Sequence, residues 1–485
     1  MNQIPSLEQL TRTKTVATVG PACATIDILT ELIREGVDVF RINMAHGSRE
    51  DHQTAVDRIR QASAEAEIHA AILIDLAGPK IRLGELHTDP IRVEPDSKIW
   101  FVRGEVSSFT MELTCNYAGL VDEVKVGNEI ILCDGLVRLE VISNDGDKVE
   151  CRVVDGGEIR SRRGVNLPGV DLKVSALGEV DIDNAKWAAA NQIDFVSLSF
   201  VRNEQEIQQL KQLLKSENSD AFVVAKIEKA EALDALDSII SATDAVMVAR
   251  GDLGVEIRIE KTPLAQKRII AKCQELGKPV IVATQMLESM HHNKQPTRAE
   301  VSDVANAILD GADACMLSGE TAVGDHPVHV VKLMQRIMRE TENELQDSPS
   351  RELSGKLDEG SISNAVVFGA AQIAKKINAA CVTIATPSGQ AALTKSKQRD
   401  FIPTFAITNR LAVARRMNLF WGIVPVYHEH LNSPKEITDY FSKCVCQEQA
   451  NANVINPGDE LVMVVDSEFW PGVHETITVG KIVNA

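Results

Sequence analysis

A group of charged residues ends or follows two neighbouring apolar segments in the middle of the chain. Lys226 lies in the segment 222–227, Glu228 follows it, and Asp252 follows the apolar run 245–249. Two carboxylates at adjacent strand ends suit Mg²⁺ or Mn²⁺, which takes one or two protein carboxylates together with waters and substrate oxygens. On a strand, Lys226 and Glu228 point to the same face. An ammonium there would stabilise charge on a transferring phosphoryl group or an enolate.

Each of these residues also has a simpler structural explanation. Asp252 could cap the helix that follows it. Gly251 could serve only the turn, although it would also let a ligand approach the backbone closely. Lys226 could do no more than form an ion pair with Glu228. The other strand ends of the chain bear on this choice.

The chain alternates between apolar runs and helical patterns, which predicts an α/β fold. Eight runs have the length and composition of strands: 15–19, 37–42, 70–74, 195–200, 222–227, 245–249, 279–284 and 312–317. Eight βα units predict a TIM (β/α)8 barrel, whose site lies at the carboxyl ends of the strands. Polar groups gather at those ends, too many to explain as packing: Arg41, Asn43, Asp75, Ser199, Lys226, Glu228, Arg250, Asp252, Thr284 and Glu320.

Two further segments interrupt or follow this barrel pattern. Residues 80–171 show short alternating strands and glycine-rich turns, which predicts an inserted all-β lid domain built as a β-barrel. The barrel domain then comprises residues 1–79 and 172–345. A charged, Ser/Pro-containing stretch at about 343–360 is typical of a linker. Residues 346–485 predict a C-terminal α/β domain.

The composition excludes several classes of function. A net charge of −18 disfavours nucleic-acid binding. The sequence has no signal pattern and no run of 18 apolar residues, so we expect a cytoplasmic protein that does not enter membranes. The nine cysteines are scattered, and Cys444 and Cys446 are too isolated for a metal site, so we expect reduced thiols.

Cationic and hydroxyl groups are predicted on the other side of the barrel mouth. Arg41, His46 and Arg82 could receive phosphate groups, because arginine binds them bidentately. A surface salt bridge is the alternative for Arg82. Thr284 offers a hydroxyl, although a threonine that ends a strand usually serves packing or a turn.

Several strings of residues together resemble the pyruvate kinase family. They occur in order along nearly the whole barrel, with the insert in the expected place. They are FRINMAHG at 40–47, DLAGPKIR at 75–82, AKIE at 225–228, MVARGDLGVE at 247–256, ATQMLESM at 283–290, AEVSDVANA at 299–307 and LSGET at 317–321. Such a set is highly specific.

The resemblance implies an activity and a role for each site residue. The family transfers the phosphoryl group of phosphoenolpyruvate to ADP, giving pyruvate and ATP in glycolysis. The implied roles are Glu228 and Asp252 for Mg²⁺ or Mn²⁺, Lys226, Arg41 and Thr284 for catalysis, Arg41, Gly251, Asp252 and Thr284 for phosphoenolpyruvate, and Asn43, His46 and Arg82 for the nucleotide. The insert would be a lid that closes and excludes water.

One departure from the family pattern concerns a monovalent cation. In members that require K⁺, the resemblance places its ligands at Asn43, a serine, Asp75 and a threonine. Here Ala45 and Leu76 stand at the serine and threonine positions, and Lys80 replaces a glutamate. A lysine at that place is typical of the K⁺-independent branch, and an ammonium can supply the charge of a bound K⁺. We therefore predict activity without K⁺.

The C-terminal domain resembles the effector domain of the family. Thr386, Ser388 and Gly389 follow a predicted strand and could cradle a phosphate, although an ordinary turn has the same composition. Trp470 stands where some members have arginine, which makes fructose 1,6-bisphosphate doubtful and leaves another sugar phosphate or AMP. The family also implies a homotetramer.

Two other functions stay open on the residues alone. Another metal-dependent barrel enzyme that acts on phosphoenolpyruvate or pyruvate, such as a lyase or aldolase, would explain Lys226, Glu228 and Asp252. It would not explain the lid with Arg82. A non-catalytic metabolite sensor on the same fold would not need Lys226, Glu228, Asp252 and Thr284 intact.

Overall fold

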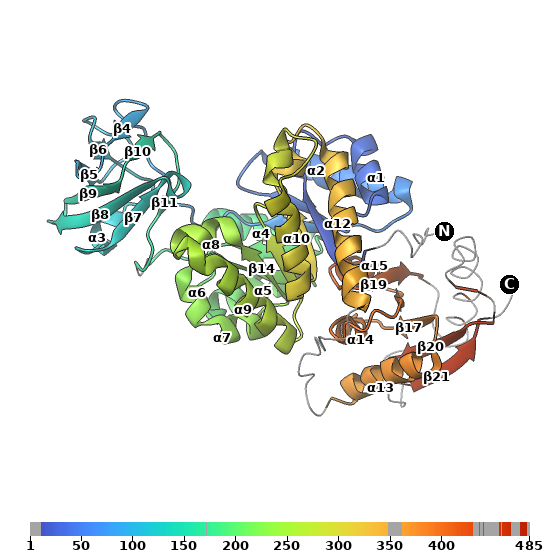
Figure 1. Ribbon diagram of the computed structural model, residues 1–485. Coiled ribbons are helices and arrows are strands. Elements are labelled where there is room, and N and C mark those ends of the chain that lie inside the picture. The colour runs from blue at the N-terminus through green and yellow to red at the C-terminus, as the bar shows by residue number, and fades with distance from the viewer. Residues whose placement is uncertain are drawn as a thin grey trace.

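The computed structural model describes residues 11–170, 172–347, 361–429, 436, 440, 455–456, 458–466 and 476–482. Figure 1 shows three parts: a central barrel, an all-β insert at one end, and a C-terminal α/β part on the opposite side. Cys444, Cys446 and Trp470 lie outside the described residues. Among the described residues, no helix has both the length and the apolar character needed to cross a membrane.

Eight parallel strands close the barrel, in the order β1-β16-β15-β14-β13-β12-β3-β2, which confirms the TIM-barrel prediction. They are β1 (Lys14–Thr18), β2 (Val39–Asn43), β3 (Ala71–Asp75), β12 (Phe195–Leu198), β13 (Phe222–Ile227), β14 (Ala245–Ala249), β15 (Val280–Ala283) and β16 (Ala314–Leu317). Their residues are almost all buried, because one face fills the barrel and the other meets the helices.

Helices surround this barrel and pack on a continuous apolar core. They are α1 (Ile26–Arg34), α2 (Arg49–Ala66), α4 (Glu179–Ala190), α5 (Glu204–Ser216), α6 (Ala230–Asp234), α7 (Leu236–Ala242), α8 (Arg250–Glu256), α9 (Thr262–Glu275), α10 (Arg298–Asp310), α11 (Gly319–Ala322) and α12 (Pro327–Asp347). Ser48 with Asp51 and Thr297 with Glu300 form capping boxes that fix the starts of α2 and α10.

The barrel extends slightly into the stretch at about 343–360 that was predicted as a linker or domain edge. Helix α12 continues to Asp347, two residues beyond the predicted barrel boundary. Its last turns are held by Glu342, a buried carboxylate that accepts hydrogen bonds from the backbone N–H groups of Arg12 and Thr13. A charged residue that looks solvated in the sequence therefore anchors the N-terminal segment.

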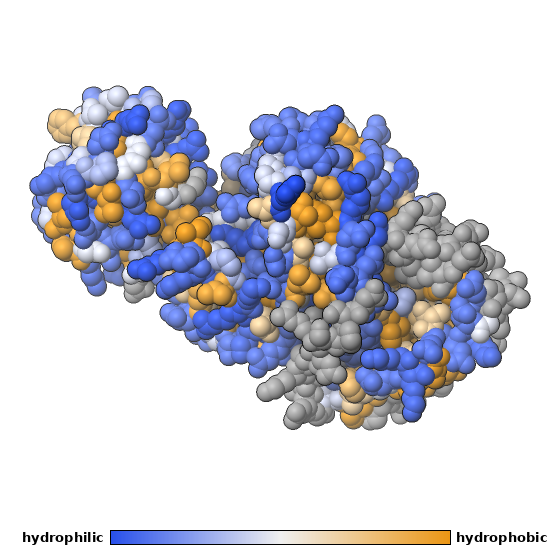
Figure 2. Space-filling model, viewed as in Figure 1, coloured by the Kyte–Doolittle hydropathy of each residue, from blue (hydrophilic) through white to orange (hydrophobic). Residues whose placement is uncertain are grey.

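The insert is an all-β half-barrel, which confirms the predicted all-β insertion. Its main sheet has the order β11-β7-β8-β9-β5-β6, with a separate β10-β4 pair, so the order has two ends. The strands are β4 (Ile91–Val93), β5 (Lys98–Val102), β6 (Glu112–Leu113), β7 (Glu129–Leu132), β8 (Val137–Asn144), β9 (Lys148–Asp155), β10 (Gly157–Ile159) and β11 (Val165–Asn166). In the space-filling view of Figure 2 the insert is a separate lobe joined to the barrel by a narrow neck.

The C-terminal part is a five-stranded sheet in the order β19-β18-β17-β20-β21, with only β21 antiparallel. Its elements are α13 (Ile362–Ile377), β17 (Cys381–Ala385), α14 (Gln390–Ser396), β18 (Thr404–Thr408), α15 (Leu411–Met417), β19 (Ile423–Tyr427), β20 (Glu460–Val465) and β21 (Thr476–Lys481). The sequence did not predict β19, because Pro425 interrupts its apolar run. The strand forms at the sheet edge, where proline is tolerated.

Candidate active site

The polar strand ends meet at one mouth of the barrel, as the sequence predicted. Asn43 lies beside Asp75 in the β2–β3 register, and Ser197 lies beside Asp75 in the β12–β3 register. The next strands bring Lys226 and Asp252 to the same end. We call Arg41, Asp75, Lys226, Glu228 and Asp252 the mouth cluster.

Asp75 is the centre of the mouth cluster. Its Oδ2 accepts hydrogen bonds from Arg41 Nε at 2.8 Å and Nη2 at 2.5 Å, and its Oδ1 accepts from Ser197 Oγ at 2.5 Å. The Nζ atom of Lys226 lies 3.3 Å from Oδ1. Burial alone would raise the pKa of Asp75, but Lys226, Arg41 and these hydrogen bonds outweigh it and lower the pKa to about 2. Asp75 is therefore ionised and orients both cations.

Lys226 forms the predicted ion pair with Glu228, with Nζ 2.9 Å from Oε1. This pair is one of several contacts of the ammonium group. Its ammonium also donates to Ser199 Oγ at 2.7 Å and faces Asp75. Burial would lower the pKa of Lys226, but Asp75 and Glu228 raise it above its ordinary value. The side chain is thus a fixed positive charge at neutral pH.

The carboxylates of Glu228 and Asp252 fit a divalent cation. Glu228 is buried, and burial together with the charge of Asp252 raises its pKa despite Lys226 and the hydrogen bond from the N–H of Phe200. Asp252 makes no hydrogen bond or ion pair with the described residues, and no side chain caps α8, so the capping explanation fails. Two cationic side chains against three carboxylates leave the cluster one negative charge in excess when all are ionised, which a hard oxygen-seeking cation would offset.

Thr284 and Gly251 lie together next to this cluster. The N–H of Gly251 donates to Thr284 Oγ1 at 2.9 Å. Thr284 has φ 67° and Gln285 has φ 58°, a left-handed conformation that is strained for a β-branched residue and typical of functional sites. Arg250, a buried side chain, holds this turn by donating to the carbonyl of Thr284 and to Asp303.

Two family models match the chain: pyruvate kinase, barrel domain, over residues 10–331, and pyruvate kinase, alpha/beta domain, over residues 364–480. The chain belongs to the pyruvate kinase family.

Individual relatives agree with this assignment. The chain is 39% identical over 431 residues to a pyruvate kinase of Geobacillus stearothermophilus, which covers 88% of this chain and 73% of the relative. A Bacillus licheniformis pyruvate kinase is 37% identical over 97% of this chain and 81% of its own length. The crystal structure of a pyruvate kinase from Cryptosporidium parvum matches with TM-score 0.90 and 31% identity, covering 98% of this chain and 97% of the other.

The activity is that of a pyruvate kinase, a phosphotransferase of glycolysis, and not the lyase, aldolase or sensor that the residues alone left open. Pyruvate kinases use a divalent metal, which agrees with the excess of carboxylates in the mouth cluster.

The structure does not bring every predicted site residue into this cluster. His46 lies exposed on the loop after β2, and Asn43 Oδ1 accepts a hydrogen bond from the N–H of Ala45. Arg82 lies at the start of the insert, where its Nη1 donates to the carbonyl of Arg162. Lys80 is exposed, and no ion pair of its ammonium is found among the described residues. Among the described residues, the side chains of His46, Arg82 and Lys80 form no hydrogen bond or ion pair with the mouth cluster, and Asn43 adjoins it only as the strand neighbour of Asp75.

The neck between barrel and insert contains a small cavity and a second buried ion pair. Asp252 and Lys80 line the cavity together with Asn166. Glu256 Oε1 accepts hydrogen bonds from Lys229 Nζ at 2.7 Å and from Asn166 Nδ2 at 3.2 Å. A barrel helix thereby holds the strand on which the chain leaves the insert.

The predicted effector loop after β17 is closed by its own hydroxyl groups. Thr386 Oγ1 accepts from the N–H of Gly389 at 3.0 Å and donates to Asp466 at 3.3 Å. The exposed Ser388 accepts from the N–H of Gln390. Gly389 has φ 84°, which favours glycine. The turn interpretation accounts for all of these contacts.

Sequence reasoning missed two groups that shape the site, Ser197 and the N–H of Phe200, and named Ser199 without its partner. Ser197 fixes Asp75, Ser199 receives Lys226, and Phe200, with φ 58°, points its N–H at Glu228. Polar residues at alternate positions of the buried run 195–200 were the available signal, because a serine inside such a strand needs a partner.

Proposed function

We propose that the mouth cluster is the catalytic centre for phosphoryl transfer from phosphoenolpyruvate to ADP. Glu228 and Asp252 hold Mg²⁺ or Mn²⁺, and Lys226 is the fixed positive charge beside them. The observation that carries this proposal is a buried ammonium 2.9 Å from Glu228, next to the unpaired carboxylate of Asp252.

The substrate would lie against residues that are already oriented. Arg41, held by Asp75, contacts the phosphate of phosphoenolpyruvate, and Gly251, Asp252 and Thr284 surround the rest of the molecule. A terminal oxygen of ADP attacks the phosphorus while the bond to the enol oxygen breaks and its electron pair stays on the enolate. Lys226 stabilises that charge. A bound divalent cation would neutralise charge on the phosphoryl oxygens.

The raised pKa of Lys226 assigns it an electrostatic role. Its ion pairs with Asp75 and Glu228 favour the ammonium form beside the reacting groups. His46, Asn43 and Arg82 would receive the nucleotide when the insert closes on the barrel and excludes water.

A coupled assay with Asp252→Asn tests the metal assignment. We expect the Mg²⁺ concentration for half-maximal activity to rise by at least about tenfold, because one of two carboxylate ligands is lost. Glu260→Gln, which alters an exposed carboxylate outside the cluster, is the matched control. An unchanged Mg²⁺ requirement in Asp252→Asn would contradict the assignment.

We also propose that the reaction needs no K⁺ and that the chain belongs to the K⁺-independent branch. Ala45 and Leu76 offer no side-chain oxygen where the family's serine and threonine would stand, and Asn43 Oδ1 is engaged by the N–H of Ala45. Omitting K⁺ from a Tris-buffered assay should leave the rate unchanged, and Lys80→Glu should lower the K⁺-free rate. A large loss of rate in the wild type without K⁺ would refute the proposal.

We propose that the protein is cytoplasmic and forms a homotetramer. We also propose that a sugar phosphate or AMP binds as an effector at Thr386, Ser388 and Gly389. Binding there requires the bond between Thr386 and Asp466 to rearrange. Titrating these effectors at subsaturating phosphoenolpyruvate, with Ser388→Ala as the variant, tests the effector site, and sedimentation tests the assembly.

A further inference from the structure

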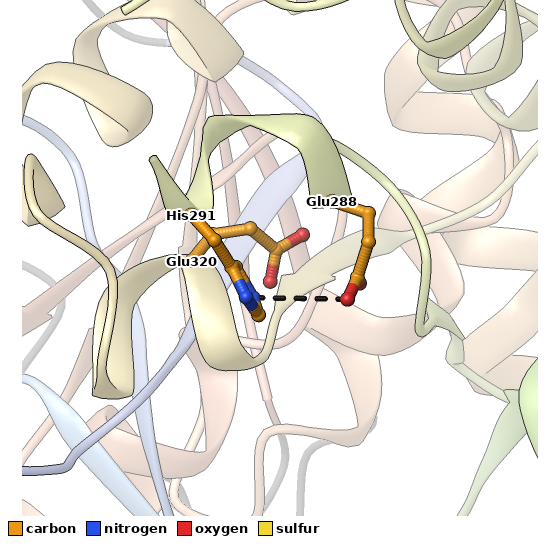
Figure 3. Close-up of side chains that lie close together, drawn as sticks. All are labelled: Glu288, His291 and Glu320. Carbon is orange, nitrogen blue, oxygen red and sulfur yellow. Dashed lines mark ion pairs between the residues drawn. The ribbon is translucent and has the colours of Figure 1, made fainter. Parts of the chain in front are cut away.

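A second group of metal-ligating side chains lies in the loops that follow β15 and β16. Glu288 and His291 belong to the short 3-10 helix η3 (Glu288–His291), and Glu320 belongs to α11. One ligand atom from each lies within 4.8 Å of the others, and His291 Nε2 is 3.9 Å from the Glu288 carboxylate. Figure 3 shows the three side chains converging, with the His291 ring and the Glu288 carboxylate facing each other and the Glu320 carboxylate close by.

Protein contacts leave one buried nitrogen in this trio without a partner and give the buried carboxylate of Glu320 only backbone N–H partners. Glu320 is 0% exposed, and its oxygens accept hydrogen bonds from the N–H groups of Leu287 and Ser318. No cationic lysine or arginine pairs with it among the described residues. The Nε2 atom of His291 is also buried and has no hydrogen-bond partner. A buried charge without a counter-charge and a buried nitrogen without a partner each cost free energy.

The imidazole is held in this position by close packing against Gly319. A Cβ atom at residue 319 would lie 2.3 Å from His291 Nε2, so only glycine admits the ring there. The carbonyl of His291 accepts a hydrogen bond from the N–H of Asp325, which fixes its backbone. The packing therefore fixes the position of His291 Nε2, the nitrogen that lacks a hydrogen-bond partner.

We propose that Glu288, His291 and Glu320 form a binding site for a divalent cation of the zinc class. One imidazole and two carboxylates are a ligand set that zinc uses, with a water in the fourth position. Two ligands about 2.0–2.2 Å from a shared tetrahedral ion lie about 3.4 Å apart, so the group must draw together by roughly 1 Å to hold zinc. Mg²⁺ prefers oxygen ligands only, which separates this site from the mouth cluster.

Zinc titration of the full-length, metal-stripped protein in millimolar Mg²⁺ tests the proposal. Mg²⁺ occupies the carboxylates of the mouth, so calorimetry should show about one tight zinc equivalent per chain at the trio. His291→Leu should lose that equivalent. His292→Leu should keep it, because His292 is the exposed neighbour whose ring bonds to Asp325 instead. Equal zinc binding by wild type and His291→Leu would overturn the proposal.

A second variant guards against a folding effect of His291→Leu. Glu288 has a side chain 55% exposed, so Glu288→Gln should leave thermal unfolding unchanged while it weakens zinc binding at least about tenfold. Co²⁺ added in place of zinc should give a visible absorption band that persists in Glu228→Gln and disappears in His291→Leu. A band that instead disappears in Glu228→Gln would place the ion at the mouth and refute the proposal.

Discussion

Two buried charge clusters lie at opposite ends of the barrel strands, and they balance charge in opposite ways. At the mouth, two cations face three carboxylates, and Asp252 has no hydrogen-bond or ion-pair partner among the described residues. At the base, Asp313 precedes β16 and is shared by Lys397 at 2.7 Å and Arg399 at 2.8 Å. Arg399 also donates to the carbonyls of Gly311 and Ala312 and stacks 4.5 Å from the Trp421 ring.

The difference separates a structural cluster from a binding cluster. At the base, both oxygens of Asp313 are used by the C-terminal domain, and Asp313 Oδ2 also accepts from the N–H of Val280. Protein groups thus complete the base and attach the C-terminal domain to the barrel. At the mouth, a bound cation would balance the excess negative charge. Substrate would occupy the phosphate-binding side.

Replacing the lysine of each cluster by methionine should give the largest difference, which is a difference in kcat. Lys226→Met should lower kcat by about 10³-fold or more, because the charge on the transferring group loses its fixed counter-charge. Lys397→Met should leave kcat within a fewfold of wild type, since Lys397 touches no substrate. Steady-state kinetics with circular dichroism as the folding control measure this, and comparable losses in both variants would remove the distinction.

Replacing one carboxylate in each cluster should affect stability in the opposite order, with the larger loss at the base. Asp313→Asn leaves Lys397 and Arg399 buried without their counter-charge, so the free energy of unfolding should fall by about 3–5 kcal/mol. Asp252→Asn should change it by less than about 0.5 kcal/mol, because Asp252 has no partner to lose in the part of the chain that the structure describes. Urea unfolding followed by tryptophan fluorescence compares the two, and a stability loss in Asp252→Asn would show that its carboxylate is structural.

A methyl group at Gly251 probes the space that the mouth reserves for substrate. The added Cβ would lie 3.5 Å from Thr284 Oγ1, an ordinary contact, so Gly251→Ala should fold normally. We expect KM for phosphoenolpyruvate to rise by about tenfold, because the methyl group occupies space beside the ligand. An unchanged KM would mean that the glycine serves only the turn.

Mild acid should lower the stability of the junction between the barrel and the C-terminal domain, with a smaller effect than the substitutions above. His69 lies at the junction, where its carbonyl accepts from Asn418 and its ring meets Tyr427. Burial, Arg415 and Arg60 lower the pKa of His69 from 6.5 to about 4. The unfolded chain binds this proton first, so stability falls as the pH drops from about 6.5 to 4. Between pH 6.5 and 4, the unfolding temperature should depend less steeply on pH in His69→Gln than in the wild type. The same dependence in both proteins would show that His69 does not cause the effect.

The sequence predicted the mouth far better than the base, for a physical reason. In a parallel barrel every strand ends at the same face, so Lys226, Glu228 and Asp252 could be placed together once the strands were recognised. Lys397 and Arg399 stand in a charged stretch that reads as solvated surface, and their burial depends on Asp313 far along the chain. The backbone turn at Phe200 was equally invisible, because no residue type predicts its φ.

The attachment at Glu256 determines how the insert can move. The insert is connected to the barrel by two segments, and the outgoing one is fastened through Asn166. The incoming segment passes through Gly78, whose φ of 64° and closeness to Phe200 admit no side chain. If the insert turns as a rigid body, the bond at Asn166 would keep that corner nearly still while the distal edge of the sheet moves furthest.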